Sequence, residues 1–306
     1  MRTDYDVIII GAGPAGLAAG LYTSRARLRT LVLEKESIGG ELVNRELIEN
    51  YPGFGEGVQG PELGSAMAQQ LMNFGAEFKC CTVAGVVSRA DYKLVKTDDE
   101  NYTCKGIIIA SGSLPKKLGV PGEETFAHRG VFYCATCDGP QFAGKAVAVA
   151  GAGDSGITEG LALARIATKV TIVEFLPQPK ASKVLQERAL SNPKIEIRCA
   201  TKIEAIIGEE HVTGLDLEDC STGAKSRLAV EGILVRIGLL PNTQFLNGVL
   251  PLTPAGQIPV NENMETSIPG IFAGGDVRQY SPMQIATAVG DGVTAAMSLG
   301  RYLESN

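Results

Sequence analysis

The chain has 306 residues, enough for two domains of ordinary size with an apolar core in each. Apolar residues make up 44% of it and charged residues 20%, a balance typical of globular proteins that excludes the disordered and fibrous classes. The net charge is −6 without any basic block, so we expect no nucleic-acid and no membrane partner. No apolar run reaches the roughly 18 residues of a membrane span.

The N-terminus and the cysteines indicate a cytoplasmic protein. The first residues lack the cationic lead and cleavage site of a secretory signal. Seven is an odd number of cysteines, which argues against a framework of structural disulfides. Only His128 and His211 are histidines, and their spacing is not that of metal ligands, so we expect no metal site. Five scattered cysteines, which we expect to be buried or half-buried, are Cys80, Cys81, Cys104, Cys199 and Cys220.

The first predicted element is a strand over residues 5–10 that leads into a glycine-rich turn. The turn reads Gly11-Ala12-Gly13-Pro14-Ala15-Gly16 and precedes a helix rich in alanine and leucine. A second strand over residues 30–33 ends in Glu34. This order is typical of a β-α-β mononucleotide-binding unit.

Each glycine of such a G-x-G-x-x-G pattern has a physical task. The first permits the tight turn, and the second lets a pyrophosphate approach the backbone. The third lets the helix pack closely on the strand, so that the helix N-terminus faces the phosphates. The acid after the second strand is placed to bind ribose hydroxyls. A single pattern remains weak evidence, because glycine-rich turns also occur without a ligand.

The same unit recurs about 140 residues later. A strand over residues 146–150 leads into Gly151-Ala152-Gly153-Asp154-Ser155-Gly156, a second helix rich in alanine and leucine, and a strand over 169–173 that ends in Glu174. The first glycine and the acid are 23 residues apart in both copies. Two copies in register favour two bound dinucleotides over two empty turns.

Between and after the copies, the chain crosses twice from one predicted domain to the other. A strand over 107–109 ends in small residues before Pro115, and residues 235–243 have a similar character. A strand over 271–273 and an alanine-rich helix over 284–303 return to the first domain. We therefore predict an α/β fold of two Rossmann-like dinucleotide-binding domains, three-layer ββα in kind, with the second inserted in the first. The predicted bounds are 1–115 with 246–306, and 116–245.

Cys134-Ala135-Thr136-Cys137 lies between the first crossing and the second glycine turn. A Cys-x-x-Cys pair alone is compatible with a metal ligand, a redox disulfide or chance. Positive potential or a helix N-terminus lowers the pKa of one thiol and makes dithiol–disulfide exchange fast near neutral pH. The neighbouring Asp138 can carry a proton to or from a departing thiolate. Beside two dinucleotide units, the pair is predicted to be redox-active.

These parts form one electron path. A nicotinamide donates a two-electron hydride, which a disulfide does not accept directly at a useful rate, whereas a flavin accepts it and passes both electrons on. Two dinucleotide sites and one dithiol therefore imply FAD in one domain, a nicotinamide nucleotide in the other, and a disulfide as the acceptor.

Five motifs follow one another along the whole chain: Gly11–Gly16 with Glu34, Gly39-Gly40-Glu41-Leu42, Glu49-Asn50-Tyr51-Pro52-Gly53-Phe54, Tyr133-Cys134-Ala135-Thr136-Cys137-Asp138-Gly139 and Gly274-Gly275-Asp276-Val277. In kind and in order they resemble the motifs of the low-molecular-weight thioredoxin reductase family. In the related glutathione-reductase-like enzymes the cysteine pair follows the first glycine turn, but residues 35–50 contain no cysteine here.

The resemblance implies a homodimer with non-covalently bound FAD, whose two domains swivel so that nicotinamide and dithiol take turns at the flavin. It implies that Cys137 faces the flavin C4a, that Cys134 attacks the disulfide of thioredoxin or a thioredoxin-like partner, and that Asp138 is the acid/base. The implied FAD residues are Gly11, Gly13, Pro14, Ala15, Gly16, Glu34, Lys35, Gly40, Glu41, Leu42, Asn50, Val83, Ala110, Gly112, Gly275, Asp276, Met283, Gln284 and Ile285. The implied nicotinamide-nucleotide residues are Gly151, Gly153, Asp154, Ser155, Gly156, Glu174, Phe175, Lys180, Ile237 and Gly238.

Three departures from the family pattern bear on the electron donor and the flavin. NADPH-dependent members carry a His-Arg-Arg run, with a further arginine nearby, after the second unit's second strand. Residues 174–180 here contain only one cation, Lys180, at the position of the later arginine. Glu174 repels a 2′-phosphate and suits a free 2′-hydroxyl. The segment resembles that of the NADH-dependent flavoprotein of alkyl hydroperoxide reductase, so we predict NADH over NADPH. Met283 replaces the family's arginine at the flavin, and Gly160 replaces a helical alanine.

Three other functions remain open at this stage. One is a thioredoxin reductase that takes electrons from ferredoxin or another donor, which the intact Gly151–Gly156 turn disfavours. A second, from another class, is a non-catalytic FAD-binding redox sensor, which has no need of a second nucleotide unit. The third is a reductase that serves a peroxiredoxin; such enzymes carry an additional N-terminal thioredoxin-like module, and this chain starts at the first strand.

Overall fold

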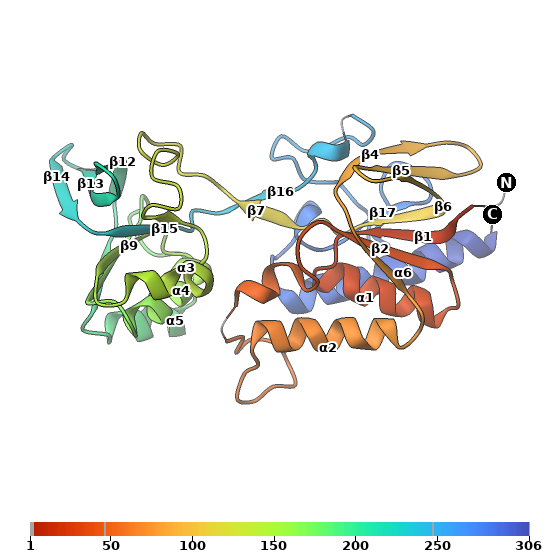
Figure 1. The fold of residues 1–306 in the computed structure, drawn as a ribbon, viewed down its shortest axis with the longest axis horizontal. Helices are drawn as coiled ribbons and strands as arrows, with labels where there is room; N and C mark the ends of the chain where they lie inside the picture. The colour runs from red at the N-terminus through yellow and green to blue at the C-terminus, as the bar shows by residue number, and fades with distance from the viewer. Residues whose placement is uncertain (1–2, 46, 247, 306) are drawn as a thin grey trace. The chain divides into compact units, whose positions relative to one another are not determined.

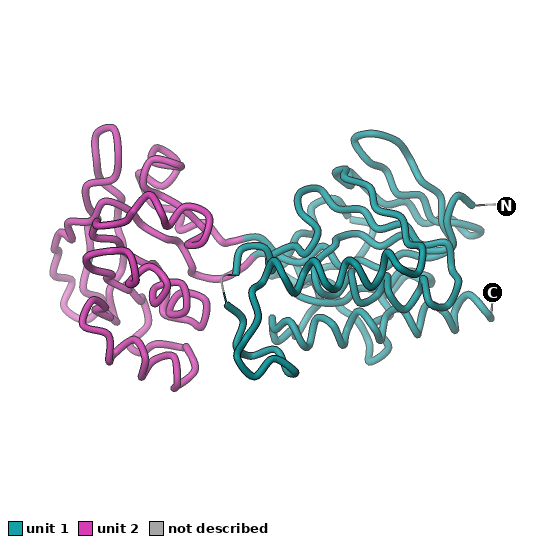
Figure 2. The backbone as a smooth tube through the Cα atoms, turned by 60° about the horizontal axis from the view of Figure 1, so that its bottom comes forward, with its two compact units in different colours: residues 1–114, 240–306 teal, residues 115–239 magenta. Residues whose placement is uncertain are grey.

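The computed structural model describes residues 3–45, 47–246 and 248–305, and Figure 1 shows its fold. The chain divides into unit 1, residues 1–114 and 240–306, and unit 2, residues 115–239, coloured separately in Figure 2. The two joining segments, β7 (Ser113–Pro115) and β16 (Leu239–Pro241), pair as a two-stranded sheet. Because of this pairing the chain returns to unit 1 at Leu240, whereas sequence analysis placed the return at residue 246.

Unit 1 is a seven-stranded sheet in the order β3-β2-β1-β6-β5-β4, with β17 paired to β6 beside this path. Its strands are β1 (Tyr5–Ile10), β2 (Thr30–Glu34), β3 (Glu77–Cys80), β4 (Val83–Ser88), β5 (Lys93–Thr97), β6 (Asn101–Ile109) and β17 (Ile271–Ala273). Its helices are α1 (Pro14–Arg25), α2 (Gly60–Met72) and α6 (Ile285–Ser305), with 3₁₀ turns η1 (Gly40–Asn44), η3 (Gln244–Leu246) and η4 (Gly275–Val277).

The sequence of β1 explains the layers of unit 1. All of its last four residues are apolar and buried, as expected of a parallel strand that is covered on both faces. Because side chains alternate along a strand, Val7 and Ile9 join the core under α1 and α6, while Ile8 and Ile10 join the core shared with β4 and β5. Figure 1 shows the three helices on one side of this sheet and the β4–β5 hairpin on the other.

Unit 2 repeats this three-layer plan with a five-stranded parallel sheet in the order β11-β10-β9-β15-β8. The strands are β8 (Val131–Phe132), β9 (Ala146–Ala150), β10 (Lys169–Val173), β11 (Ile195–Arg198) and β15 (Gly232–Val235). Helices α3 (Ala135–Asp138), α4 (Asp154–Ala164) and α5 (Lys183–Leu190), with the 3₁₀ turn η2 (Gly139–Phe142), share one core with the sheet. The antiparallel sheet of β12 (Thr201–Gly208), β13 (Val212–Asp219) and β14 (Lys225–Ala229) shares the other.

Packing accounts for one departure from the family pattern. A Cβ on Gly160 of α4 would lie 3.1 Å from Ile172 Cδ1 on β10, closer than an ordinary contact, so glycine here lets the helix lie near the sheet. The expectation of buried cysteines was wrong for Cys80 and Cys220, which are exposed, because one ends the edge strand β3 and the other lies in the turn after β13.

Two negative findings apply to the described residues. Among them, no helix is both long and apolar enough to cross a membrane, α6 included. In the same part of the chain, no group of three or more His, Cys, Asp and Glu side chains is arranged to hold a metal ion.

Candidate active site

The first glycine turn joins β1 to α1, and two of its glycines are required by the protein itself. Gly11 has a φ of +105°, and a Cβ there would lie 2.3 Å from the carbonyl oxygen of Ala110. A Cβ on Gly16 would lie 1.9 Å from the carbonyl oxygen of Gly11. Neither position can carry a larger residue unless the backbone moves, which fixes the close approach of α1 to the strand.

The middle glycine has a different environment. Nothing lies within 4 Å of the position that a Cβ on Gly13 would occupy. No protein contact therefore requires a glycine there, but a side chain would fill the space in front of the N-terminus of α1, where a pyrophosphate binds in such units. The turn thus fits a dinucleotide, because the open space at Gly13 is available for the pyrophosphate.

The second turn, between β9 and α4, has the same construction. Gly151 has a φ of +101°, and a Cβ there would lie 2.3 Å from the carbonyl oxygen of Arg236. A Cβ on Gly156 would lie 2.0 Å from the carbonyl oxygen of Gly151, while the space around Gly153 is open to 4 Å. Both turns therefore fit the pyrophosphate of a dinucleotide by the same test.

The two acids also hold matching positions. Glu34 accepts hydrogen bonds from the backbone N–H of Ala12 (2.8 Å) and of Glu36 (3.1 Å). Glu174, which is buried, accepts them from Ala152 (2.7 Å) and Leu176 (3.0 Å). Each carboxylate is thereby fixed beside its glycine turn, and each carboxylate oxygen keeps a further lone pair that can accept from a ribose hydroxyl.

Distant segments of unit 1 converge on the first turn. The backbone N–H of Gly39 donates to the carbonyl oxygen of Ala12 (2.8 Å), and a Cβ on Gly40 would lie 3.0 Å from Gly13 Cα. A Cβ on Gly275 would lie 2.9 Å from Ala15 Cβ. The structure thus brings the predicted residues of η1 and η4 to the predicted phosphate loop.

A second contact links two other predicted residues that are far apart in the sequence. Asn50 Nδ2 donates to Gln284 Oε1 at 2.9 Å, just before α6 begins at Ile285. Met283 precedes Gln284 in the left-handed conformation, at a φ of +55°, and is exposed. Burial raises the pKa of Asp276, and the carboxylates of Asp291 and Glu41 add to this effect.

The remaining predicted residues of unit 1 lie in segments that backbone hydrogen bonds, ion pairs and burial hold in place. Cys81 N–H donates to the carbonyl oxygen of Glu34 (3.0 Å), which sets Val83 near the end of β2. Lys35 forms an ion pair with Glu36 (2.9 Å), and Leu42 is buried in η1 beside Glu41. Ala110 and Gly112 follow β6, where Gly112 has a φ of +63° and its carbonyl oxygen accepts from Asn242 N–H (3.0 Å).

In unit 2 the segment after Glu174 folds back over the second turn. The N–H of Lys180 donates to the carbonyl oxygen of Ala152 (3.1 Å), and Asp154 Oδ1 accepts from Ser182 N–H (2.7 Å). Phe175 is 62% exposed, and Lys180 is exposed. Ser155 lies in the first turn of α4, while Ile237 and Gly238 follow β15 beside Gly151. All of these residues therefore lie at the carboxyl edge of the parallel sheet, where open α/β sheets bind ligands.

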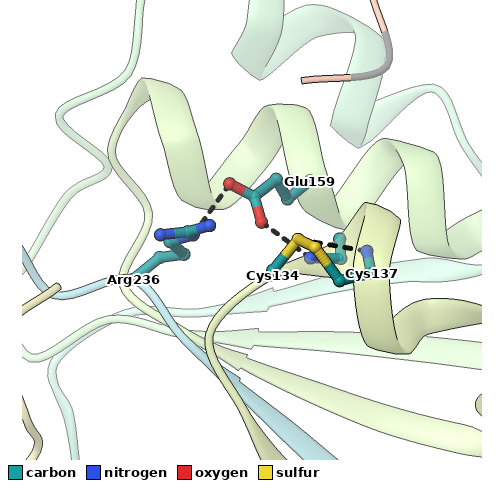
Figure 3. Close-up of a disulfide and its surroundings, with 5 residues drawn as sticks. Cys134, Cys137, Glu159 and Arg236 are labelled. Carbon is teal, nitrogen blue, oxygen red and sulfur yellow. Dashed lines mark hydrogen bonds and ion pairs between the residues drawn. A yellow bond between two sulfur atoms is a disulfide. The ribbon is translucent and has the colours of Figure 1, made fainter. Parts of the chain in front are cut away.

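Cys134 and Cys137 form a disulfide in unit 2, with their Cα atoms 5.4 Å apart (Figure 3). Cys134 is the N-cap of the single-turn helix α3, and its sulfur accepts a hydrogen bond from the Cys137 N–H at 3.0 Å. Cys134 is half-buried and Cys137 is exposed. Asp138 ends α3, and its N–H donates to the carbonyl oxygen of Cys134 (3.1 Å). The local turn therefore holds both sulfurs in one tight ring with a carboxyl group beside them.

Sequence analysis missed a buried ion pair next to this ring. Glu159 on α4 accepts from the N–H of Ala135 (3.1 Å), and its other oxygen lies 2.7 Å from Arg236 Nε (Figure 3). Both side chains are nearly inaccessible to solvent, at 6% and 4% exposed. The signal in the sequence was an acid on the apolar face of the nucleotide helix and an arginine at the end of an otherwise apolar strand.

Comparison with known proteins gives a consistent result over the whole chain. The family model described as pyridine nucleotide-disulphide oxidoreductase matches residues 5–292. Thioredoxin reductase of Bacillus subtilis (strain 168) is 44% identical over 301 residues, which cover 98% of this chain and 95% of that protein. The crystal structure of Lactococcus lactis thioredoxin reductase is 40% identical with a TM-score of 0.97, covering 99% of this chain and 100% of that one. The T. acidophilum thioredoxin reductase structure is 34% identical with a TM-score of 0.95, covering 99% of both chains.

Two Rossmann-like units and a Cys-x-x-Cys disulfide define the class of flavoprotein oxidoreductases that act on disulfides. Within that class, the chain belongs to the low-molecular-weight thioredoxin reductase family. The predicted fold and the resemblance read from the motifs are both confirmed. Membership of this family implies FAD and a nicotinamide nucleotide as cofactors.

Proposed function

We propose that this protein passes two electrons from NADH, through non-covalently bound FAD and the Cys134–Cys137 disulfide, to the disulfide of thioredoxin or a thioredoxin-like protein. The overall reaction is balanced when NADH, one proton and the partner's disulfide give NAD⁺ and the partner's dithiol. The observation that carries the proposal is the redox-capable disulfide in unit 2, in a chain with one dinucleotide turn in each unit.

The two turns have different roles in this proposal. The turn at Gly11–Gly16 would hold FAD, together with the residues of unit 1 that converge on it, and the turn at Gly151–Gly156 would hold the nicotinamide nucleotide. When bound, the flavin supplies the conversion of a hydride into an electron pair that a disulfide accepts. The protein's own task is to fix both dinucleotides by their phosphates and riboses, which the open middle glycines and the fixed acids support.

The environments of Cys134 and Cys137 support different roles for the two cysteines. After reduction, the Cys137 N–H would stabilise Cys134 as a thiolate, because its hydrogen bond to that sulfur is already formed. We therefore assign Cys134 as the nucleophile that attacks the partner's disulfide and Cys137 as the sulfur that exchanges electrons with the flavin. Asp138, one residue further, would donate and accept the proton that accompanies each step.

The segment after β10 supports NADH as the donor. The carboxylate of Glu174 is buried and fixed by two backbone N–H groups beside the second turn, so it cannot swing away from a ribose bound there. A 2′-phosphate would bring negative charge next to this carboxylate, whereas a 2′-hydroxyl can donate to it. Phe175 and Leu176 occupy the positions where tandem arginines would be needed to clamp a phosphate.

The test is an anaerobic titration of the purified flavoprotein, first with NADH and then with NADPH, followed at the flavin absorbance. We expect NADH to bleach the flavin and kcat/KM for NADH, with a thioredoxin as acceptor, to exceed that for NADPH at least tenfold. A tenfold preference for NADPH would overturn the assignment of the donor. Failure of both nucleotides to bleach the flavin would favour ferredoxin or another donor. Rapid bleaching without turnover on any thioredoxin, unchanged in Cys137→Ser, would favour the redox sensor.

A paired substitution tests the cause of the preference. Replacing Phe175 and Leu176 together by arginine should improve kcat/KM for NADPH by about tenfold or more, because two guanidinium groups would then face the 2′-phosphate. Lys225→Gln, at an exposed position of β14, is the control and should leave the ratio of kcat/KM for the two nucleotides unchanged.

Two further parts of the proposal concern assembly and compartment. We propose a homodimer, as the family pattern implies, to be checked by analytical ultracentrifugation of the holoenzyme against the chain mass of 32.1 kDa. We propose the cytoplasm as its compartment, since the five remaining cysteines are free thiols, which a reducing environment maintains.

A further inference from the structure

The buried pair of Glu159 and Arg236 connects the redox disulfide to the nucleotide-binding strand within unit 2. Arg236 directly follows β15, and its N–H donates to the carbonyl oxygen of Ala150 at 2.8 Å. Its own carbonyl oxygen lies against Gly151, where a Cβ would approach to 2.3 Å. The backbone of Arg236 is therefore fixed by the second glycine turn, and its side chain extends to Glu159 (Figure 3).

At the other end of the pair, Glu159 acts on the first peptide of the disulfide ring. Its Oε2 accepts the N–H of Ala135, the residue between Cys134 and the rest of α3. At the start of a helix this buried N–H has no acceptor within the helix, so its burial would be unfavourable without the carboxylate of Glu159. The carboxylate thus fixes the ring at the residue next to the Cys134 sulfur.

The charges of this pair are poorly screened, because both side chains are almost fully buried. Other charged groups on the neighbouring elements lie nearer to solvent or have their own partners. Asp138 is half-buried, and Asp154 and Arg165 lie at the exposed ends of α4. Before the ring, Tyr133 donates to Glu123 at 2.7 Å, and the backbone N–H groups of residues 118 and 119 also donate to that carboxylate.

We propose that Glu159 and Arg236 are positioning residues for the redox pair. Glu159 anchors the start of the Cys134–Cys137 ring, and Arg236 balances the carboxylate's charge so that the ring can be reduced. Reduction takes two electrons and two protons, breaks the S–S bond and leaves two thiols, of which one ionises to react. A net negative charge beside the ring opposes that ionised form, and a net positive charge favours it. This inference rests on the proposed redox role of the two cysteines.

The proposal predicts opposite effects for the two halves of the pair. Glu159→Gln keeps an oxygen for the Ala135 N–H but leaves Arg236 unbalanced, so the disulfide should become easier to reduce. Arg236→Met removes the positive charge that lies 2.7 Å from the carboxylate, so the disulfide should become harder to reduce. We expect each variant to change the equilibrium constant with dithiothreitol by about tenfold, which is ~30 mV for a two-electron couple. Arg236→Lys, which keeps the charge, should restore a value close to that of the unaltered protein.

The measurement is made on the holoenzyme and does not depend on turnover. The protein is equilibrated anaerobically with dithiothreitol at several ratios of reduced to oxidised form, quenched with acid and alkylated. The reduced fraction of the peptide that carries both cysteines is then read by mass spectrometry. Opposite shifts of the two single variants support the proposal, and shifts in one direction or no shifts overturn it. If the unaltered protein shows no reducible Cys134–Cys137 disulfide, the proposed function itself fails.

The chain offers a matched control in the same unit. Arg198 and Glu196 on β11 form an ion pair with the same Nε–Oε1 distance of 2.7 Å, at the opposite edge of the sheet from β8 and the ring. Glu196→Gln and Arg198→Met should leave the equilibrium of the Cys134–Cys137 couple unchanged. Shifts as large as those at Glu159 and Arg236 would mean that any loss of charge in unit 2 has this effect, and the proposal would be wrong.

A buried charge without its partner can prevent folding, so two double variants keep the test decisive. Glu159→Gln with Arg236→Met removes both charges and keeps the acceptor for Ala135. Glu159→Leu with Arg236→Met removes the charges and the acceptor. The first should match the unaltered protein in its equilibrium constant. The second should exchange with thioredoxin at least tenfold more slowly, at unchanged rates of flavin reduction. Equal behaviour of the two would overturn the anchoring role of Glu159.

Discussion

The two glycine turns of this protein are nearly identical in geometry and differ in what surrounds them. In both, the first glycine has a φ close to +100°, a Cβ on the third would lie about 2 Å from a carbonyl oxygen, and a Cβ on the middle one would meet no atom within 4 Å. In both, an acid at the end of the next strand accepts the N–H of the residue after the first glycine. The surroundings differ: Gly40 and Gly275 close on the first turn, and Arg236 and Lys180 lie at the second.

The features that the two turns share and the features that differ determine different parts of the bound dinucleotide. The shared geometry specifies a pyrophosphate and a ribose, because only backbone groups, glycines and one carboxylate are involved. Nothing in it distinguishes FAD from a nicotinamide nucleotide. That distinction depends on the neighbouring segments, η1 and η4 in unit 1 and the stretch after Glu174 in unit 2. Substitutions at matching positions of the two turns should therefore have the same kind of effect, each on the dinucleotide of its own unit.

The largest effect is expected from alanine at the third glycine of each turn. Gly16→Ala and Gly156→Ala each place a Cβ within 2.0 Å of a carbonyl oxygen, so helix and strand must separate. Gly16→Ala should abolish FAD retention and lower the free energy of unfolding by ~3 kcal/mol or more. Gly156→Ala should keep bound FAD and lose the response to NADH. Flavin absorbance after gel filtration and the nucleotide titration distinguish the two.

Gly300 in α6 provides the control for this pair. Nothing lies within 4 Å of a Cβ at Gly300, so alanine there should leave both cofactors in place and stabilise the helix by up to ~1 kcal/mol. If Gly16→Ala binds FAD normally, or if Gly156→Ala releases FAD instead of losing the response to NADH, the turns do not serve separate cofactors and the comparison is wrong.

A second, smaller effect should appear at the middle glycines without any loss of stability. Gly13→Ala and Gly153→Ala meet no protein atom within 4 Å, but the methyl group occupies the space in front of the helix N-terminus. We expect the affinity for FAD to fall about tenfold or more in the first and the affinity for NADH to fall similarly in the second. Thermal unfolding of the cofactor-free proteins should be unchanged within ~0.5 kcal/mol.

Affinity is measured by flavin fluorescence for the first variant and by isothermal titration calorimetry for the second. Unchanged affinity in either variant would show that the open space is not where the pyrophosphate lies. Loss of stability would show that these glycines serve the fold rather than the ligand.

The repeated turns were predictable because their signals are local. Glycine spacing, the strands before and after it and the acid all lie within about 30 residues, and the backbone of each copy follows from them. The Cys134–Cys137 disulfide was predictable for the same reason. The sheet of β12, β13 and β14 was not, because β14 carries exposed charged side chains and lacks the apolar alternation that marks a half-buried strand.

Contacts between residues that are far apart in the sequence could not be predicted either. The pairs Glu159 with Arg236 and Asn50 with Gln284 join residues that no local pattern connects. Each depends on the register of elements that pack together only in the finished fold. For a similar reason the chain returns to unit 1 at Leu240 and not at the predicted residue 246: β7 and β16 pair across a long insertion.

The smallest effect is expected at β11, the edge strand of the sheet of unit 2. Glu196 on β11 contacts Lys169 at 2.5 Å and Arg198 at 2.7 Å, and the hydrogen bonds from Arg198 and Lys169 lower the pKa of Glu196 to about 2. A carboxyl group with a lowered pKa in the folded state stabilises that state above its unfolded pKa, and the contribution disappears as the pH falls through the folded value. Because these side chains are partly exposed, we expect Glu196→Gln to cost only about 1 kcal/mol at pH 7.

The pH dependence separates this electrostatic effect from a packing defect. The difference in the free energy of unfolding between Glu196→Gln and the unaltered protein should be constant from pH 7 to about pH 5 and should shrink steadily between pH 4.5 and pH 2, as the native carboxylate is protonated. Urea unfolding followed by circular dichroism at pH 7, 5 and 3 measures it. Glu209→Gln, in an exposed turn, should have little effect at any of these pH values. A cost at pH 3 as large as that at pH 7 would mean that the amide disturbs packing at the edge of unit 2, and that the ion pairs of β11 do not stabilise it.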